Sequence, residues 1–227
     1  AWVRLSKQVW PLFWRTLPLG AVSMLVSLNV NAPRLLLKRL HGAKPLGGFG
    51  PLSYLPALGQ MFLLALGQTF SPRLAGHYQR GELRPFLRLL LIYQGLTTLL
   101  WAVGFVFVWM FGPLLLSVLF QESYMKNHDI FLILWGFSVF LFWGGAFGFG
   151  CGATRQFQTF LWPVALQAVL TTGLSAWLIW HGSQRGAAWA SACSYVLHFV
   201  AQGGLFFYII RRDLSAGRLC WTHEGVG

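Results

Sequence analysis

The hydrophobic pattern divides the chain of 227 residues into six long apolar segments separated by polar connections. Each segment has about 20 residues or more, enough for a helix to cross a hydrocarbon core of roughly 30 Å at about 1.5 Å per residue. The segments are approximately Leu17–Leu37, Gly47–Phe70, Phe86–Phe111, Ile130–Gly150, Phe157–Trp180 and Ala187–Ile210. We therefore expect an all-α integral membrane protein with about six transmembrane helices.

The connections leave no room for a second, soluble domain. Two are longer than the rest: Ser71–Pro85, which is polar and basic, and Gly112–Asp129. We expect residues 1–16 to form a cytoplasmic N-terminal segment, 17–212 a six-helix transmembrane lobe and 213–227 a cytoplasmic tail. The chain starts at Ala1 without a Met or a signal-peptide pattern, so we interpret it as a fragment that lacks upstream sequence.

Composition supports a membrane protein. Hydrophobic residues make up 56% of the chain and charged residues 10%, with a mean hydropathy of +0.59, whereas soluble domains carry about 25% charged residues. The net charge of +12 could indicate nucleic-acid binding. However, the basic residues are spread over short segments between apolar runs, so anionic lipid headgroups or an anionic substrate are the simpler partners.

Basic residues are unevenly divided between the two sides of the expected bundle. The side with both termini takes Arg4, Lys7, Arg15, Arg73, Arg80, Arg84, Arg88, Arg155, Arg211, Arg212 and Arg218; the other side takes Arg34, Lys38, Arg39, Lys44, Lys126 and Arg185. The positive-inside rule then predicts that both ends of this multi-pass protein are cytoplasmic.

The first segment carries a stripe of small and polar residues on one helical face. Its members follow steps of three and four: Gly20, Ser23, Ser27, Asn31, Arg34 and Lys38. Asn29 lies off this stripe. A bare Arg in hydrocarbon costs about 2.5–3.5 kcal/mol on insertion scales. Arg34 is therefore expected either to extend toward the membrane surface or to face a wet cavity, where it could meet a phosphate.

The second segment repeats this polar pattern more weakly. On one helical face it carries Ser53, Pro56, Gln60, Gly67 and Ser71, and Gln68 flanks this face. Buried amides can hydrogen-bond sugar hydroxyls, or they can hold helices together. The fourth segment has Gly144, Gly148 and Gly152 at four-residue spacing, which indicates close helix packing.

No catalytic or metal-binding arrangement is legible in the sequence, and no cofactor is expected. The carboxylates are Glu82, Glu122, Asp129, Asp213 and Glu224, and none lies in an expected span. The three cysteines form no CxxC pair.

The first 90 residues contain motifs that resemble a known family. They include PLG opening the first segment, NVNAPR at 29–34 and SPRLAGHYQRGELRPF at 71–86; fainter matches follow in LFQESY, FGFGCGATRQFQ and GAAWASACSYVLH. The chain thereby resembles the C-terminal six-helix lobe of Wzx-type flippases, the polysaccharide biosynthesis branch of the multidrug, oligosaccharidyl-lipid and polysaccharide exporter superfamily.

The resemblance implies a function. These flippases move an undecaprenyl-diphosphate-linked oligosaccharide, such as an O-antigen unit, across the bacterial inner membrane, through a cavity between two MATE-like lobes. Arg34, Asn29 and Asn31 match the motif's arginine and asparagines. The implied substrate path consists of Ser23, Ser27, Asn29, Asn31, Arg34, Gln60 and Gln68. The partners would be membrane lipid, the lipid-linked sugar and the missing N-terminal lobe, with no nucleic acid.

Other functions stay open at this stage. A multidrug antiporter or a peptidoglycan-precursor flippase would belong to the same superfamily. A membrane glycosyltransferase or polymerase would need an external acid, for which Glu122 and Asp129 are the candidates. A non-catalytic membrane scaffold is a further alternative. We expect a transporter and not an enzyme.

Overall fold

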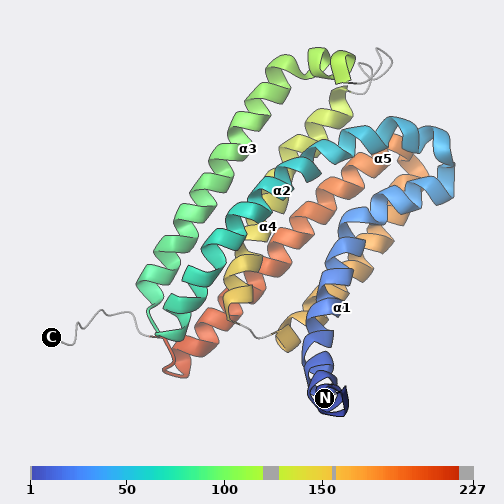
Figure 1. Ribbon diagram of the computed structural model, residues 1–227. Coiled ribbons are helices and arrows are strands. Elements are labelled where there is room, and N and C mark those ends of the chain that lie inside the picture. The colour runs from blue at the N-terminus through green and yellow to red at the C-terminus, as the bar shows by residue number, and fades with distance from the viewer. Residues whose placement is uncertain (1, 120–127, 155–156, 220–227) are drawn as a thin grey trace.

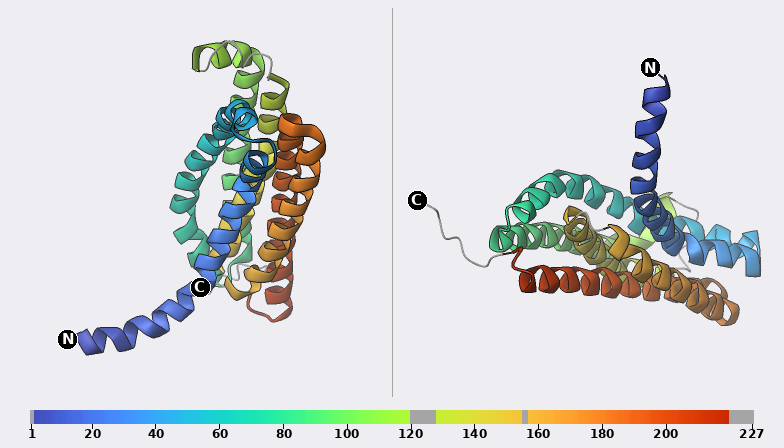
Figure 2. Two further views of the ribbon diagram at one scale, coloured as in Figure 1. Left: turned by 90° about the vertical axis from the view of Figure 1, so that its right-hand side faces the viewer. Right: turned by 90° about the horizontal axis from the view of Figure 1, so that it is seen from below.

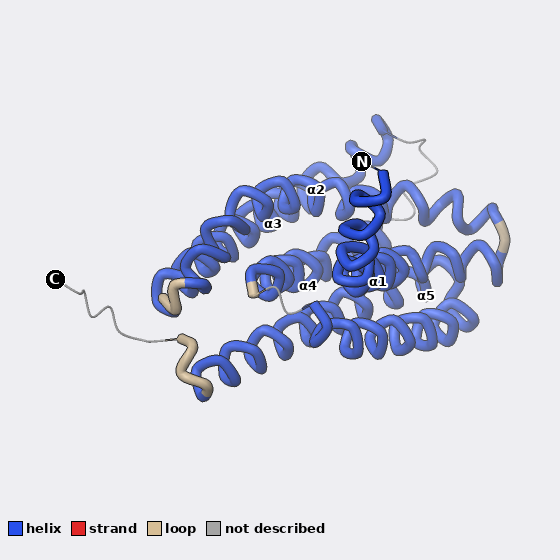
Figure 3. Tube along the Cα trace, turned by 60° about the horizontal axis from the view of Figure 1, so that its bottom comes forward, coloured by secondary structure: helices blue, strands red, loops and turns tan. Residues whose placement is uncertain are grey.

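The computed structural model describes residues 2–119, 128–154 and 157–219, and these residues form helices and short turns without a strand (Figures 1 and 3). Every helix contains a stretch long and apolar enough to cross a membrane. The expected all-α class is therefore confirmed for the described residues, and the lengths and apolar composition of the helices are compatible with a membrane protein. The helices are α1 (Trp2–His41), α2 (Ala43–Gln79), α3 (Leu83–Leu119), α4 (His128–Ala153) and α5 (Phe157–Ser215).

Helix α5 contains both the fifth and the sixth expected segments, so the described residues form five helices and not six separate ones. It bends at Ser183, whose φ of 47° and ψ of −121° are not helical. The two arms run antiparallel: Gln167 lies beside His198, and a Cβ on Gly186 would lie 2.1 Å from the carbonyl oxygen of Leu178. The bend therefore needs a glycine at 186, because any side chain would collide with the first arm.

The helices run alternately up and down one elongated bundle (Figures 1 and 2). The first described residues of α1 and the last ones of α5 point to the same end, which also carries the α2–α3 turn. We name it the Asp213 end after a residue of the last turn of α5. The opposite end carries the turn at Gly42 and the bend of α5, and we name it the Gly42 end. The first part of α1 projects away from the bundle (Figure 2).

Apolar clusters hold the two ends of the bundle together. Near the Gly42 end, Leu37 of α1 and Phe49 of α2 pack with Ile179 of α5. Near the Asp213 end, Phe86 of α3 packs with Phe206 of α5, with ring centroids 6.2 Å apart. These contacts fix α1, α2 and α3 against the hairpin of α5.

Helices α1, α2 and α3 are longer than the apolar segments from which they were predicted. Ser71–Pro85 was expected to be a connection, but α2 continues to Gln79 and α3 begins at Leu83. The reason is packing: Leu74 is fully buried, and the Tyr78 ring lies 5.8 Å from that of Phe86. Similarly, α1 runs from Trp2 without a break at the expected boundary between residues 16 and 17.

Candidate functional site

An open groove of about 740 Å³ lies between α1 and the first turns of α2. We name it the α1–α2 groove. Side chains on one face of α1 form one wall of the groove, because residues three or four positions apart lie one above another on a helix. The lining residues are Met24, Ser27, Leu28, Asn31, Arg34, Leu35 and Lys38 from α1 and Leu46, Gly50 and Tyr54 from α2.

Arg34 is the best-anchored side chain of the groove. Its Nε–H donates to the hydroxyl of Ser53 at 2.8 Å, and its Nη2–H donates to the Ser53 carbonyl at 2.6 Å. The Ser53 hydroxyl in turn donates to the carbonyl of Gly50 at 2.7 Å. The guanidinium is therefore held between the two helices, and it is only half-buried, so part of it faces the groove.

An aromatic ring and a second cation flank Arg34. Its Cζ lies 4.2 Å from the centroid of the Tyr54 ring, a distance at which a cation is attracted to the ring face. Lys38 lies one turn further along α1 and is exposed. No carboxylate is among the described lining residues. The groove is thus positively charged, and its chemistry favours an anion.

Asn31 links Ser27 to Arg34 along the polar wall of the groove. Its Nδ2–H donates to the carbonyl of Ser27 at 2.9 Å, and its Oδ1 accepts from Nη1 of Arg34 at 3.4 Å. The remaining wall is apolar, with Met24, Leu28, Leu35 and Leu46. One groove therefore offers a charged, hydrogen-bonding part and an aliphatic part side by side.

The structure gathers some of the expected path residues and separates others. Ser27, Asn31 and Arg34 line the groove together. Ser23 is exposed one turn before Ser27 and is outside the lining set. Asn29 is 4% exposed, which places it on the packed side of α1 and away from the groove.

The two glutamines of α2 are also outside the groove lining: Gln60 is half-buried and Gln68 is exposed. Both lie further along α2, toward the Asp213 end, than Tyr54 does. Their role in a substrate path stays a prediction.

The three spaced glycines of α4 differ in their surroundings. A Cβ on Gly144 would lie 2.5 Å from Cδ2 of His198, and one on Gly148 would lie 3.9 Å from Oε1 of Gln202. A Cβ on Gly152 would meet no atom within 4 Å. Of these three glycines, Gly144 is therefore the one at which α4 approaches the second arm of α5 most closely.

Tyr54 is a groove residue that the sequence reasoning missed. It is one of many aromatic side chains in an apolar segment, and 59% of it is exposed. Only its distance from Arg34 distinguishes it, and that distance depends on how α1 packs on α2. Ser53, by contrast, belongs to the polar face predicted for the second segment, although it was not included in the expected substrate path.

A second polar set lies inside the hairpin of α5. Gln167 Nε2 lies 3.4 Å from Nδ1 of His198, which joins the two arms. Thr171 and Ser175 continue the row on the first arm, at intervals of four residues, and both are fully buried. Polar residues at such spacing hold transmembrane helices together through interhelical contacts.

The acids considered for an enzyme give no catalytic cluster among the described residues. Asp129 is 74% exposed and lies 3.8 Å from the Arg185 guanidinium, as an ion pair on the surface. Glu122 lies outside the described residues.

Comparison with known proteins gives one partial relative. No protein-family profile matches the chain, and no solved structure matches it. The chain is similar to the capsular polysaccharide biosynthesis protein CapF of Staphylococcus aureus. The two are 32% identical over 125 residues, which are 54% of this chain and 31% of CapF. The match thus spans about a third of the length of that relative.

Proposed function

We propose that this chain is one lobe of a transporter that flips an undecaprenyl-diphosphate-linked oligosaccharide across the bacterial inner membrane, for surface polysaccharide biosynthesis. The α1–α2 groove is the observation that carries the proposal. It combines a fixed cation, an exposed tyrosine and an aliphatic wall on helices of membrane-spanning length. The name of the partial relative, a capsular polysaccharide biosynthesis protein, supports the same pathway.

The groove matches the three chemical parts of such a substrate. The Arg34 guanidinium and the Lys38 ammonium would attract the diphosphate, since Arg presents a planar fork of donors to phosphate oxygens. The exposed ring of Tyr54 offers a flat surface for a sugar ring. The aliphatic residues beside them would accept the first isoprene units of the lipid.

Arg34 is prepared for this task by its contacts with Ser53. A long Arg side chain has about 2 kcal/mol of rotamer entropy, part of which is lost when it binds a ligand. Because two hydrogen bonds already hold the guanidinium, less of that entropy remains to be lost on substrate binding.

Transport of a hydrophilic headgroup requires a wet path that is closed from hydrocarbon. In this proposal, a second lobe faces the α1–α2 groove and completes the cavity. Rocking of the two lobes then exposes the cations first to the cytoplasm and then to the periplasm. The chain acts without covalent change to the substrate, so it is not an enzyme.

A reconstitution experiment tests this function. Full-length protein in proteoliposomes would receive a fluorescent undecaprenyl-diphosphate oligosaccharide in the inner leaflet, and dithionite added outside would quench each molecule that arrives in the outer leaflet. The proposal predicts protein-dependent quenching and an unchanged substrate mass. A new glycosidic product would favour a membrane glycosyltransferase, and protein-independent quenching would contradict transport.

A further inference from the structure

Helix α3 exposes one continuous stripe of residues on its outer face. The stripe follows steps of three and four along the helix, so its members lie one above another. Its residues, from the Asp213 end toward the Gly42 end, are Arg84, Arg88, Leu91, Gly95, Leu99, Val103, Val106 and Met110. We name this set the α3 stripe. The opposite face of α3 packs on the bundle, where Phe86 is fully buried and Tyr93 is 1% exposed.

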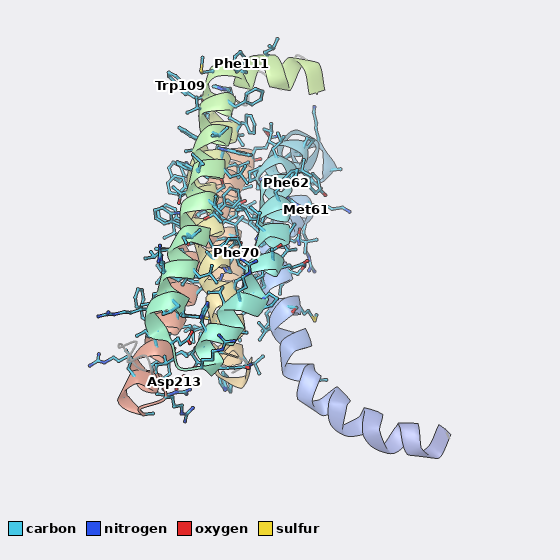
Figure 4. All side chains as sticks on the ribbon, turned by 60° about the vertical axis from the view of Figure 1, so that its left-hand side comes forward. Met61, Phe62, Phe70, Trp109, Phe111 and Asp213 are labelled. Carbon is cyan, nitrogen blue, oxygen red and sulfur yellow. The ribbon has the colours of Figure 1, made fainter. Side chains whose placement is uncertain are left out.

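The apolar part of the stripe is about as long as the hydrocarbon core of a bilayer is thick. The stripe is apolar from Leu91 to Met110, with exposed Trp109 beside its end, and further exposed large hydrophobic residues of α3 follow as far as Leu114. Twenty residues of helix span about 30 Å, which equals the thickness of the hydrocarbon core. Trp109 and Phe111 lie at one end of this band, and Asp213 lies at the opposite end of the bundle (Figure 4).

The composition of the stripe favours contact with lipid over contact with another helix. Transmembrane helices that pack on one another are enriched in small residues, which let the backbones approach closely. Between Leu91 and Met110 the stripe has one small residue, Gly95, and otherwise Leu, Val and Met. Large aliphatic side chains without polar atoms suit acyl chains.

Two arginines stand where the apolar band stops. Arg84 and Arg88 are four residues apart on the same face, and both are exposed. Neither forms an ion pair with a carboxylate among the described residues; the nearby Glu82 is paired with His77 at 2.6 Å. Among the described residues, these two exposed guanidinium groups therefore have no carboxylate partner, and they lie directly beyond the last apolar residue of the stripe.

We propose that the α3 stripe faces the bilayer and that Arg84 and Arg88 bind the phosphate headgroup of an anionic phospholipid at the Asp213 end. The inference rests on α3 alone and does not depend on the α1–α2 groove or on flipping. Arg suits this role because its planar donors can engage phosphate oxygens in pairs. This assignment also fixes the position of α3 relative to the bilayer. The hydrocarbon core begins between Arg88 and Leu91 and ends near Trp109.

Spin labelling tests the lipid cover. Full-length protein in nanodiscs of phosphatidylcholine and phosphatidylglycerol would carry a nitroxide at Leu91→Cys, Leu99→Cys or Val106→Cys. We expect high accessibility to oxygen at all three, greatest at Leu99→Cys, and low accessibility to a water-soluble nickel reagent. Labels that oxygen cannot reach would show that a partner lobe or a second copy covers α3, which would overturn the proposal.

Lipid retention tests the headgroup site. Native mass spectrometry would count the phosphatidylglycerol molecules that remain bound to the full-length protein released from these nanodiscs. One basic residue near an anionic surface is worth a factor of about five in binding. Arg84→Gln and Arg88→Gln should each reduce retention by that order. The double Lys variant keeps the charge but loses the planar donors, so its retention should lie between those of the double Gln variant and the unmodified protein.

The matched control is Arg185→Gln, which removes an exposed arginine that Asp129 already pairs with at 3.8 Å. It should leave retention within twofold of the unmodified protein. Equal retention by the double Gln variant and the unmodified protein would show that Arg84 and Arg88 do not hold the headgroup.

Discussion

Arg34 and Ser53 join α1 to α2 by two hydrogen bonds, of 2.8 Å to the serine hydroxyl and 2.6 Å to its carbonyl. The Arg34 side chain is half-buried and lines the α1–α2 groove. These two residues are 19 positions apart in the chain. Their contacts hold α1 against α2 and at the same time fix the position of the cation in the candidate site.

Replacing Ser53 by Ala should weaken this joint without removing the cation. The variant loses the hydroxyl acceptor but keeps the carbonyl acceptor, so we expect a destabilisation of about 1 kcal/mol. In a cooperative unit of about 150–250 residues, this corresponds to a fall in melting temperature of about 2–4 °C. Thermal unfolding in detergent, followed by tryptophan fluorescence, measures it. Ser27→Ala is the control, because the carbonyl of Ser27 still accepts from Asn31; equal losses in both variants would contradict the special role of Ser53.

Gly144 and Gly152 should respond oppositely to alanine. A Cβ at Gly144 would lie 2.5 Å from Cδ2 of His198 and 3.2 Å from the backbone Cα of Phe199, so Gly144→Ala should destabilise by about 1–3 kcal/mol. At Gly152 there is space, and alanine favours helix over glycine by up to about 1 kcal/mol. Parallel melting curves of the two variants check this. A Gly144→Ala protein as stable as Gly152→Ala would show that α4 does not pack closely on α5.

Asp213 should be essential for docking α5 onto the α2–α3 turn. Its carboxylate is fully buried, accepts a hydrogen bond from the Tyr78 hydroxyl, and lies 3.4 Å from Arg212 and 3.6 Å from Arg218. Water can solvate the Arg212 and Arg218 side chains, which are 38% and 66% exposed, so the cost of Asp213→Ala comes mainly from the lost hydrogen bonds to this charged group and should be at least about 1.5–3 kcal/mol. Tyr78→Phe should cost about 1.5–3 kcal/mol, because it loses a hydrogen bond to a charged group.

The control for these two variants is Tyr208→Phe, since the Tyr208 side chain is exposed. Thermal unfolding of the three variants in the same detergent gives the order of stability. An Asp213→Ala protein as stable as Tyr208→Phe would contradict the docking role.

Cysteine labelling should place the two ends of the bundle on opposite sides of the membrane. Arg39 at the Gly42 end and Arg84 at the Asp213 end are both exposed, so a cysteine at either position is accessible to solvent. In spheroplasts, a membrane-impermeant maleimide should label Arg39→Cys and should label Arg84→Cys only after permeabilisation. The native cysteines would be replaced by serine beforehand. The opposite labelling would reverse the orientation inferred from basic residues.

The sequence predicts the membrane class and the polar stripe of α1 because both depend on local periodicity. Steps of three and four place Ser27, Asn31 and Arg34 on one face in any helix, and the structure has them lining one groove. Asn29 was predicted to lie off the stripe, and it is indeed buried on the packed side.

Features that depend on two distant segments could not be predicted in this way. The ring of Tyr54 becomes part of the site only because α2 folds back over α1 at Gly42, whose φ is 85°. The helical course of Ser71–Gln79 was also missed, because its stability comes from Leu74 and Tyr78 packing on α3 and α5 and not from an apolar run.

The residues of the motif SPRLAGHYQRGELRPF have a structural role in the α2–α3 turn. Leu74, Leu83 and Phe86 of this motif are fully buried, and Gly81 adopts a φ of 74° in the α2–α3 turn. A Cβ on Gly81 would lie 3.0 Å from the carbonyl oxygen of Arg218. These positions shape the turn that receives the end of α5, so the motif describes docking and not substrate contact.

The rate of flipping by Arg34→Ala, relative to Arg39→Ala, tests the central claim most directly. Both variants remove one cation from the last two turns of α1, but only Arg34 lines the groove. With equal amounts of folded protein in proteoliposomes, the account predicts an initial rate at least about tenfold lower for Arg34→Ala, because a lost charge-assisted hydrogen bond is worth about 1.5–3 kcal/mol. Arg39→Ala should transport at the unmodified rate. Equal rates for the two variants would contradict the assignment of the α1–α2 groove as the phosphate site.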